Sequence, residues 1–363
     1  MKGILITGAD GYLGLRLATE YARCGGRPLL LWIHAKDEQE FLTKKARLAN
    51  QLQDRDGQVS YFWGDLTWAN PFEGINPSDV GTILHAAAIV RFNVAEDAAR
   101  QVNVEGTRRL LRLAERCTSL DAFGLISTMY VSGLRSGVIA EAPMDDAAGF
   151  ANYYEWSKWR SENILLSEFN ILPWRIFRIA TVIADGEDGQ VVQHNAVHNT
   201  LKLLYHGLIS LVPGNPQTPL YFVTREFVAE AVYALMHHPG ERVIYHLAHR
   251  KEDSVALDEL IDIAFSAFGE SQDFTGRRIL RPLYTDFEAF QRLVEGVTGF
   301  GGPLLQQAVT SVAPFAKQLF TEKDIQNRNL IASYPGYRAP GARQLVHNTC
   351  RHLVQAKWGR ETA

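Results

Sequence analysis

The sequence predicts an α/β protein in which a doubly wound parallel sheet is joined to a smaller, mostly helical C-terminal lobe. Short apolar runs alternate with helical patterns over the first half of the chain, and this alternation implies crossover connections between parallel strands. A glycine-rich turn follows the first apolar run, where the first strand would meet the first helix. Beyond about residue 183 the alternation ends. Together these observations predict a Rossmann-type sheet.

The predicted strands are short and apolar, which is typical of strands that are buried on both faces of a parallel sheet. They cover residues 3–6, 29–33, 59–63, 82–88, 122–126 and 176–183. Apolar residues at helical spacing predict helices between these strands. The helices cover residues 13–24, 38–52, 95–116 and 154–169.

The second half of the chain has a different pattern. A predicted helix over residues 190–206 leads into the turn cluster Pro213-Gly214-Asn215-Pro216. A strand (220–223), a helix (225–237) and a strand (242–247) follow, and the chain is mostly helical from Ser254 onward. We therefore expect a nucleotide-binding domain over residues 1–185, with a return segment near 220–250, and a substrate-binding lobe over 186–363.

Composition and charge narrow the class of protein. The 363 residues are 46% hydrophobic and 21% charged, which is ordinary for a globular chain with a sizeable core. A net charge of -3 gives no electrostatic reason to expect nucleic acid as a partner. The three cysteines, Cys24, Cys117 and Cys350, are widely spaced and odd in number, which favours unpaired thiols in a reducing compartment.

The ends of the apolar segments bear on targeting. The first predicted strand begins near residue 2, which leaves no room for a signal peptide ahead of it. No segment reaches the roughly 20 apolar residues that a transmembrane helix needs. We expect a cytoplasmic protein without a transmembrane segment.

The glycine turn reads Thr7-Gly8-Ala9-Asp10-Gly11-Tyr12-Leu13-Gly14. Glycine allows a tight turn and a close approach of the backbone to a pyrophosphate, which would lie at the N-terminus of the following helix. The spacing differs from G-x-G-x-x-G. We predict that Gly8, Gly11, Tyr12, Leu13 and Gly14 bind a dinucleotide; the alternative is a strand-to-helix turn without a ligand.

The residues after the second predicted strand bear on the choice of cofactor. NAD sites place an acidic side chain there, whereas NADP sites use basic groups for the 2′-phosphate. His34 and Lys36 precede the first acid, Asp37. This order favours NADP (NADPH), with NAD less favoured; the alternative is that both side chains belong to a polar loop edge. Asp65, after the third strand, is placed to accept a hydrogen bond from the adenine amino group, or else to cap the next helix.

A tyrosine and a lysine provide a candidate proton-transfer group. Tyr154 and Lys158 are four residues apart on a predicted helix, so their side chains share one face, whereas Tyr153 is out of register. The ammonium would lower the phenol pKa, so that Tyr154 could give a proton to a carbonyl oxygen while a cofactor moves a hydride. Lys158 could also hold the nicotinamide ribose. The pattern occurs by chance, but Tyr154 is the only tyrosine with a lysine at this offset.

A hydroxyl group ends the fifth predicted strand, at the sheet edge where α/β proteins bind ligands. Thr128 could donate a hydrogen bond to the substrate oxygen beside Tyr154, and Ser127 is its close competitor. On its own, a threonine at this place is more often a turn residue.

Residues 2–250 resemble the extended short-chain dehydrogenase/reductase family. The resemblance implies NAD(P)-dependent chemistry with a catalytic triad of Thr128, Tyr154 and Lys158. Thr128 is preferred to Ser127 because Gly133 sets the family register.

Within that family the chain is similar to the thioester-reductase and fatty acyl-CoA reductase branch. The segments that carry the similarity are His85-Ala86-Ala87-Ala88-Ile89-Val90-Arg91-Phe92, Asn103-Val104-Glu105-Gly106-Thr107 and Phe150-Ala151-Asn152-Tyr153-Tyr154-Glu155-Trp156-Ser157-Lys158. The resemblance implies reduction of an acyl thioester to an aldehyde or alcohol, usually with NADPH. We also expect Leu66, Ala86 and Ala87 to contact the cofactor.

The chain departs from this branch at three places. His34 stands where Arg is common, Arg178-Ile179 replaces an Arg-Pro step, and Val223-Thr224-Arg225-Glu226 replaces a Val-Pro-Val-Asp-like segment.

Other enzymes remain open, namely an NAD(P)-dependent dehydrogenase or ketoreductase for a hydrophobic alcohol or ketone, and, less favoured, a sugar-nucleotide epimerase. A non-catalytic NAD(P)-binding regulatory protein is the rival from a different class. The expected partner is a small or carrier-bound hydrophobic substrate, and the chain would be a monomer or homodimer.

Two further patterns are open. His194 and His198 have metal-ligand spacing, but without the glutamate of an H-E-x-x-H site or a cysteine cluster we predict no metal. Phe287, Phe290, Leu293, Val294 and Val297 repeat at helical spacing, and residues 304–320 are also apolar. These segments could line an acyl tunnel, form a lid or touch a membrane surface, although an ordinary core or subunit-contact helix is favoured.

Overall fold

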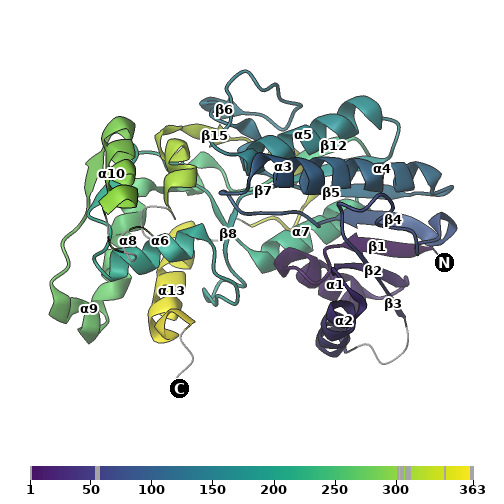
Figure 1. Cartoon of the computed structure of the whole chain (residues 1–363), viewed down its shortest axis with the longest axis horizontal. Coiled ribbons are helices and arrows are strands. Elements are labelled where there is room, and N and C mark those ends of the chain that lie inside the picture. The colour runs from purple at the N-terminus through teal and green to yellow at the C-terminus, as the bar shows by residue number, and fades with distance from the viewer. Residues whose placement is uncertain are drawn as a thin grey trace.

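The computed structural model describes residues 2–53, 58–300, 302, 306, 312–338 and 341–359. A seven-stranded parallel sheet fills the right-hand part of Figure 1, and helices from the second half of the chain gather at the left. The predicted doubly wound α/β fold is confirmed. Its strands, in sheet order, are β12 (Val243–Leu247), β7 (Trp174–Ile179), β5 (Ala122–Thr128), β4 (Val80–His85), β1 (Gly3–Thr7), β2 (Leu29–His34) and β3 (Val59–Gly64).

Helices cover both faces of this sheet because successive side chains of a buried strand point to opposite faces. Ile4 and Ile6 of β1 pack in one core, and Leu5 packs in the other. The helices that cover the sheet are α1 (Tyr12–Cys24), α2 (Glu38–Leu52), α3 (Glu96–Ala98), α4 (Gly106–Arg116), α5 (Tyr153–Glu168) and α7 (Arg225–His237).

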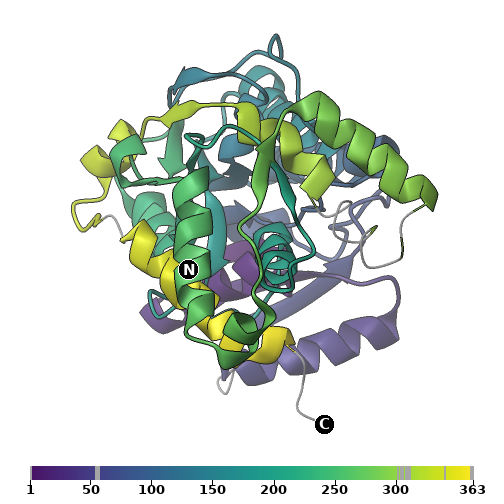
Figure 2. The ribbon, with the colours of Figure 1, turned by 90° about the vertical axis from the view of Figure 1, so that its left-hand side faces the viewer.

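The remaining elements include the helices of the C-terminal lobe, onto which Figure 2 looks. Here α8 and α13 pack together over a separate buried core. The helices are α6 (Ala196–Tyr205), α8 (Leu257–Gly269), α9 (Gln272–Arg277), α10 (Phe287–Phe300), α12 (Arg328–Ser333), α13 (Ala342–Gln355) and the 3-10 helix η5 (Ala313–Phe320). The short strands are β6 (Gly137–Ile139), β8 (Thr181–Ala184), β9 (Leu211–Pro213), β10 (Pro219–Leu220), β11 (Phe222–Thr224), β13 (Val255–Ala256), β14 (Leu283–Thr285) and β15 (Lys323–Ile325).

Several predicted elements need correction. The strand predicted over residues 176–183 is interrupted at Ala180, whose backbone N–H donates to the Leu247 carbonyl (3.1 Å), and β8 then pairs with β11 rather than continuing in the large sheet. The helix predicted over residues 190–206 begins only at Ala196, because the Asn195 side chain caps it by accepting from the Val197 backbone N–H (2.9 Å). The predicted strand 220–223 is divided between β10 and β11.

The long helix predicted over residues 95–116 contains a π-helical segment, residues 99–105. Asn103 lies in this segment and its side-chain amide bonds the backbone of Ile89 and the Ser157 hydroxyl (2.9 Å). The local widening therefore joins the loop after β4 to α5.

Late segments of the chain return to the first half. Strand β12 lies in the large sheet beside β7, α7 packs against α1, and β15 pairs with β6. The first two lie in the segment near 220–250 where we predicted a return, while the boundary near residue 185 stays a prediction. No helix in the described parts of the chain has the length and apolar character needed to cross a bilayer.

Candidate active site

A single cavity of about 730 Å³ joins the carboxyl edge of the sheet to the C-terminal lobe. The glycine turn after β1 lines one end, and Thr128, Tyr154 and Lys158 line its middle. Side chains of α6, α8 and η5 line the rest. This is the crevice between β1 and β4 where the strand order reverses, at which open α/β sheets bind their ligands.

The glycine turn has no room for side chains at two of its three glycines. Gly8 has φ +68°, and a Cβ there would lie 2.8 Å from the backbone of Ala87. A Cβ at Gly14 would lie 2.0 Å from the Gly8 carbonyl oxygen. The Gly11 backbone N–H donates to that same oxygen (2.9 Å), and α1 begins directly after Gly11. The turn thus exposes bare backbone at a helix N-terminus, which fits a diphosphate group.

Some of the other predicted cofactor contacts line the cavity and others do not. Tyr12, Leu13 and Ala86 line the cavity, and the Tyr12 hydroxyl donates to Asp185 (2.7 Å) while the Arg225 guanidinium lies 4.6 Å from the centre of its ring. No local pattern indicated that Tyr12, Asp185 and Arg225 meet, because they come from three distant segments.

Leu66 and Ala87 do not line the cavity. The Leu66 side chain is buried in the core against Gly106, and the Ala87 backbone N–H donates to the Thr7 hydroxyl (3.3 Å). Both residues therefore lie behind those that line the cavity.

His34 and Asp65 contact each other, with 3.1 Å between the His34 Nε2 and an Asp65 carboxylate oxygen. The other Asp65 oxygen accepts from the backbone N–H and the hydroxyl of Thr67. Partial burial opposes ionisation of Asp65, but hydrogen bonds from Thr67 and His34 prevail and hold its pKa below the usual value. These two residues, which we predicted separately, form one polar group at the ends of β2 and β3.

Two basic residues of α2 reach the same edge, and sequence reasoning missed both. The Lys44 ammonium binds Asp10 (3.2 Å), Glu40 (3.0 Å) and the His34 carbonyl (2.7 Å). The Arg47 guanidinium lies 3.5 Å from the Asp10 carbonyl oxygen in the glycine turn. The spacing of Lys44 and Arg47 could have indicated this, because residues three apart on a helix share a face.

Of the three residues predicted to transfer the proton, Thr128 and Tyr154 contact each other and Lys158 lines the same cavity. The Thr128 hydroxyl is hydrogen-bonded to the Tyr154 phenol oxygen, and it also accepts from the Tyr130 backbone N–H (3.3 Å). Ser127, the competitor, instead donates to the buried Glu162 carboxylate (2.5 Å). Thr128 is therefore the hydroxyl that faces Tyr154.

Burial dominates the electrostatics of this group. It raises the pKa of Tyr154, and the hydrogen bond from Thr128 is the influence that opposes it. Burial also lowers the pKa of Lys158 to about 8, against the opposing charge of Glu162, and its ammonium donates to the Ile126 carbonyl (2.6 Å). We expected Lys158 to lower the pKa of Tyr154, and this expectation was wrong for the structure as it stands. Tyr154 keeps its proton at neutral pH, as a proton donor requires.

A buried ion pair lies behind these residues. The Arg178 guanidinium binds both oxygens of Glu162, at 2.8 to 3.2 Å, and both side chains are almost fully buried. The pair links β7 to α5, while the neighbouring Ile179 lines the cavity. In the Arg178-Ile179 step, where the chain departs from the family sequence, the arginine thus has a structural role.

Phe92 joins Tyr154 to two further aromatic rings. The Phe92 ring centre lies 5.6 Å from that of Tyr154, 6.0 Å from that of Tyr130 and 5.9 Å from that of Phe315. Phe92 comes from the loop after β4 and Phe315 from η5, so this cluster connects the two halves of the cavity. Sequence reasoning did not single out either residue.

The two histidines with metal-ligand spacing have a structural setting. Both ring nitrogens of His198 are engaged, one by the Asn195 backbone N–H (3.0 Å) and the other by the Ile183 carbonyl (2.8 Å). His194, which precedes the start of α6, lines the cavity. Among the residues that the structure describes, no group of three His, Cys, Asp or Glu is placed to hold a metal ion.

The apolar segments of the lobe are partly described. Phe290 of α10 is buried against Val312 and Ala316, next to the cavity wall, so one face of this helix packs on η5. Of the predicted apolar segment 304–320, residues 304, 305 and 307–311 lie outside the described residues. Phe315 and Leu319 of the remainder line the cavity.

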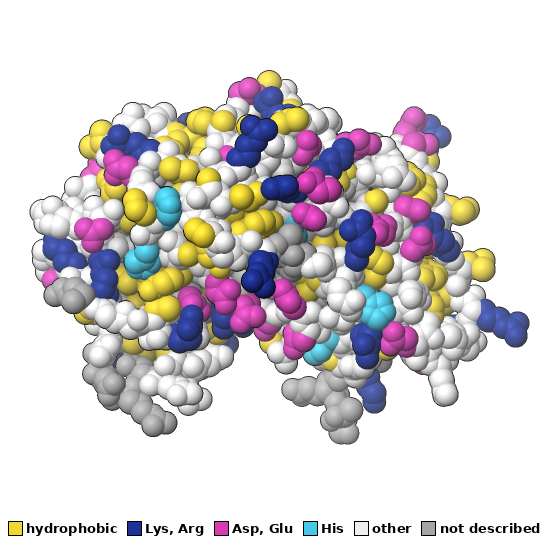
Figure 3. Space-filling model, turned by 180° about the vertical axis from the view of Figure 1, so that it is seen from behind, with side chains coloured by type: hydrophobic (Ala, Val, Ile, Leu, Met, Phe, Trp, Pro, Cys, Tyr) yellow, Lys and Arg dark blue, Asp and Glu magenta, His cyan; other side chains and the backbone are white. Residues whose placement is uncertain are grey.

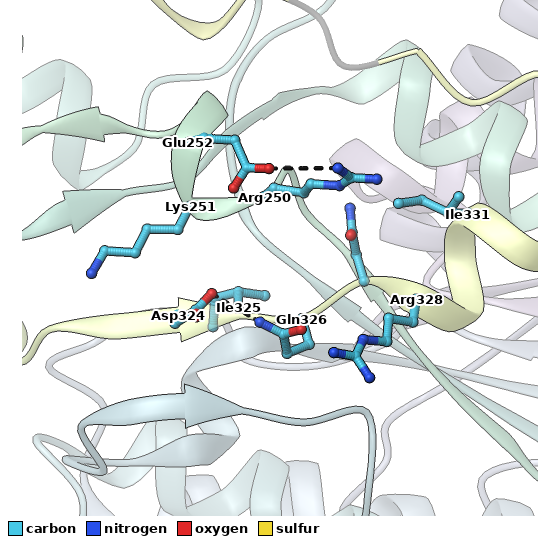
Figure 4. A pocket seen from close by; sticks show the side chains of 9 residues that line it. Arg250, Lys251, Glu252, Asp324, Ile325, Gln326, Arg328 and Ile331 are labelled. Carbon is cyan, nitrogen blue, oxygen red and sulfur yellow. Dashed lines mark hydrogen bonds and ion pairs between the residues drawn. The ribbon is translucent and has the colours of Figure 1, made fainter.

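A second cavity, of about 690 Å³, lies beyond the end of β12 and shares no lining residue with the first. Its lining is mostly polar and of mixed charge, with Arg250 and Glu252 3.5 Å apart (Figure 4). On the face seen in Figure 3 acidic and basic side chains are likewise interspersed, so neither sign dominates that face.

Comparison with known proteins gives a consistent picture. Residues 6–232 match the family model described as male sterility protein. A chloroplastic fatty acyl-CoA reductase 2 from Arabidopsis thaliana is 30% identical over 187 residues, which are 43% of this chain and 29% of that protein. Fatty acyl-CoA reductase 2 from Homo sapiens is 24% identical over 297 residues, which are 68% of this chain and 57% of that protein. The chain thus spans less than two thirds of the length of these relatives.

A solved structure matches almost the whole chain. The terminal R domain from the myxalamid PKS-NRPS biosynthetic pathway has a TM-score of 0.78 and 20% sequence identity, covering 99% of this chain and 92% of that one. At this identity the match shows the fold. It extends over the C-terminal lobe, for which the sequence indicated little.

Proposed function

Because the chain belongs to the male sterility protein family, we propose that it is a nicotinamide-dependent reductase that acts on the carbonyl group of an acyl thioester. The resemblance to the thioester-reductase branch is confirmed by that family match and by the relatives described above. The observation that carries the proposal is one cavity in which Thr128 and Tyr154, hydrogen-bonded to each other, lie between a bare glycine turn and an apolar lobe.

The cofactor would be held at its diphosphate by the turn from Gly8 to Gly14, whose backbone leaves no space for side chains at those two positions. Bound there, a reduced nicotinamide supplies hydride. We propose NADPH, because two acids at the edge formed by β2 and α2 already have a basic partner. Asp10 and Glu40 are paired with Lys44, whereas Lys36 and Arg47 form no ion pair within the described parts of the chain.

The residues of this chain would manage the proton. Thr128 and Tyr154 would bind the carbonyl oxygen, and Tyr154 would donate its phenolic proton to that oxygen as the carbon accepts hydride. Lys158, whose ammonium carries its charge below a pH of about 8, would hold the nicotinamide ribose. The carbon–sulfur bond of the resulting hemithioacetal then breaks, which releases an aldehyde and a thiol.

The test is NADPH oxidation by the purified protein, with a medium-chain acyl-CoA and a hydrophobic ketone offered in parallel and the products identified by mass. Thioester-dependent formation of aldehyde or alcohol is expected. Tyr154→Phe should lower kcat by about 10²-fold or more while the Kd for NADPH stays within a factor of about two. Tyr153→Phe, at the exposed neighbouring position, is the matched control and should keep full activity.

Other outcomes point to the alternatives. Turnover of the ketone alone would favour a dehydrogenase or ketoreductase that uses the same triad. Tight NADPH binding without any turnover would favour the non-catalytic, regulatory alternative. Full activity in Tyr154→Phe would refute the role assigned to this tyrosine.

A further inference from the structure

Four aliphatic side chains that pack together form part of the cavity wall in the C-terminal lobe. Val212 comes from β9, Leu257 and Ile261 from α8, and Leu319 from η5. They form one buried cluster and all four line the cavity, with exposed fractions between 1% and 8%. We call them the closing cluster.

Aromatic contacts connect this cluster to the proposed reaction centre. Phe92 touches Tyr154, Phe315 touches Phe92, and Phe315 packs on the closing cluster. A chain that leaves a carbonyl carbon beside Tyr154 can therefore follow apolar surface from the reaction centre to the closing cluster.

This arm of the cavity suits an alkyl chain. From Leu201 onward, every described lining side chain is apolar except Tyr221, whose hydroxyl donates to the Lys323 carbonyl (2.6 Å). An amide or a charged group in the arm would lose its water without a hydrogen-bonding partner, which is unfavourable. Polar lining residues are found instead from Gln193 to Thr200, at the start of α6.

The backbone behind the closing cluster fixes its position. A Cβ at Gly214 would lie 2.7 Å from Leu257 and 2.9 Å from Leu319, so both side chains press against bare backbone. The Leu319 carbonyl accepts from the Thr218 hydroxyl (2.6 Å), and the Leu257 backbone N–H donates to the Thr218 carbonyl (3.0 Å). The turn after β9 thus fixes both leucines, and the arm cannot lengthen by a simple side-chain shift.

From this geometry we propose that Val212, Leu257, Ile261 and Leu319 set the longest acyl chain that the enzyme reduces. The inference rests on the proposed thioester reductase function and specifies its substrate: an unbranched, uncharged acyl chain whose methyl end meets the closing cluster. Chains that stop short of the cluster gain affinity with each methylene, and chains that reach past it are excluded.

The test changes the depth of the arm in both directions. Ile261→Ala and Leu319→Ala each remove three carbons and should move the optimum of kcat/KM to acyl-CoAs two or more carbons longer. Ile261→Phe should move it to shorter chains. The ratio to follow is kcat/KM for an acyl-CoA two carbons longer than the parent optimum, divided by kcat/KM for the parent's optimal acyl-CoA. We expect this ratio to rise about tenfold in each alanine variant. Leu353→Ala, in the lobe core but outside the cavity, is the control for lost stability.

A binding measurement separates this inference from the proposed function. Displacement of a fluorescent fatty-acid probe by acyl-CoAs of increasing length needs no turnover, and its length limit should move in the same direction in each variant. If the parent reduces thioesters but the optimum stays the same in all three variants, the inference fails and the function stands. If the parent reduces no thioester but the binding limit moves, the arm is assigned correctly and the reaction is wrong. A shift of equal size in Leu353→Ala, or no binding at any length, would overturn the inference.

Discussion

At the scale of single residues, Lys36 and Arg47 are the two cations that we propose for contact with a 2′-phosphate. Lys36 follows β2, and Arg47 reaches the glycine turn from α2. His34, the residue at the family's arginine position, already contacts Asp65. A 2′-phosphate at this edge would then meet Lys36 and Arg47 together with the partly engaged imidazole of His34.

Arg47→Ala should therefore weaken NADPH binding more than NADH binding. Losing one charged hydrogen bond to a phosphate should raise the Kd for NADPH by about 10-fold or more, while the Kd for NADH changes by less than about twofold. Titration of nicotinamide fluorescence measures both constants. Arg116→Ala, on an exposed arginine at the end of α4, is the control. Equal weakening of both cofactors would contradict the proposed 2′-phosphate contact.

At the scale of elements, η5 is fastened to the first turn of α5, the helix that carries Tyr154. The Gln318 side-chain amide donates to the Glu155 carboxylate (2.9 Å) and to the Gly133 carbonyl (3.1 Å). The Lys323 ammonium donates to the same carbonyl. Burial raises the pKa of Glu155 to about 7, although hydrogen bonds and the charge of Lys323 oppose this. The polar cluster thus determines where Phe315 of η5 lies relative to Tyr154.

Gln318→Ala should loosen this attachment, because it leaves two buried acceptors with one donor fewer. We expect a loss of about 1–3 kcal/mol in the free energy of unfolding and a higher KM for the thioester, with the Kd for NADPH unchanged. Chemical denaturation and steady-state kinetics measure these effects. Gln344→Ala, on the exposed face of α13, is the matched control and should alter neither. An unchanged KM would show that η5 keeps its position without Gln318.

At the scale of the whole molecule, four buried histidines make the fold sensitive to acid. Burial is the main cause that lowers the pKa of His85 and His246 to about 3, and of His198 and His249 to about 4. In His246 the nitrogen Nε2 accepts from Arg178 and Nδ1 donates to the Gln326 carbonyl, so the ring is held neutral. The unfolded chain binds protons at these sites at a higher pH than the native protein does.

The free energy of unfolding should therefore decrease as the pH falls from about 6.5 toward 4, because the unfolded state then binds more protons. Each such histidine contributes at most about 1.4 kcal/mol per pH unit within this window. Glu155 opposes the trend, since its raised pKa favours the native state as pH falls below about 7. Denaturation curves at pH 7, 6 and 5 measure the slope.

His246→Gln removes one of the four histidines that take up a proton on unfolding. The slope of its free energy of unfolding against pH should therefore be smaller than that of the parent. His237→Gln, at an exposed position, is the control. A slope that is the same in His246→Gln and in the parent would show that this ring does not take up a proton on unfolding.

The sequence by itself determined the sheet, most of its helices and the positions of the principal site residues. These features depend on local rules. Apolar runs mark buried strands, Gly8 and Gly14 stand where a Cβ would collide with backbone, and the four-residue spacing of Tyr154 and Lys158 places both on one face of α5. Their roles in binding and catalysis remain proposals.

Only the tertiary structure decided which residues meet across the cavity. It engaged Ser127 with Glu162 and left Thr128 with Tyr154, and it interrupted the sheet strand at Ala180. It also brought Phe315 to Phe92 and placed Ile261 and its neighbours together in the cavity wall. The physical reason is distance along the chain. A periodic pattern records which face of an element is buried, but the partner of that face can lie more than a hundred residues away and leaves no mark on the local sequence.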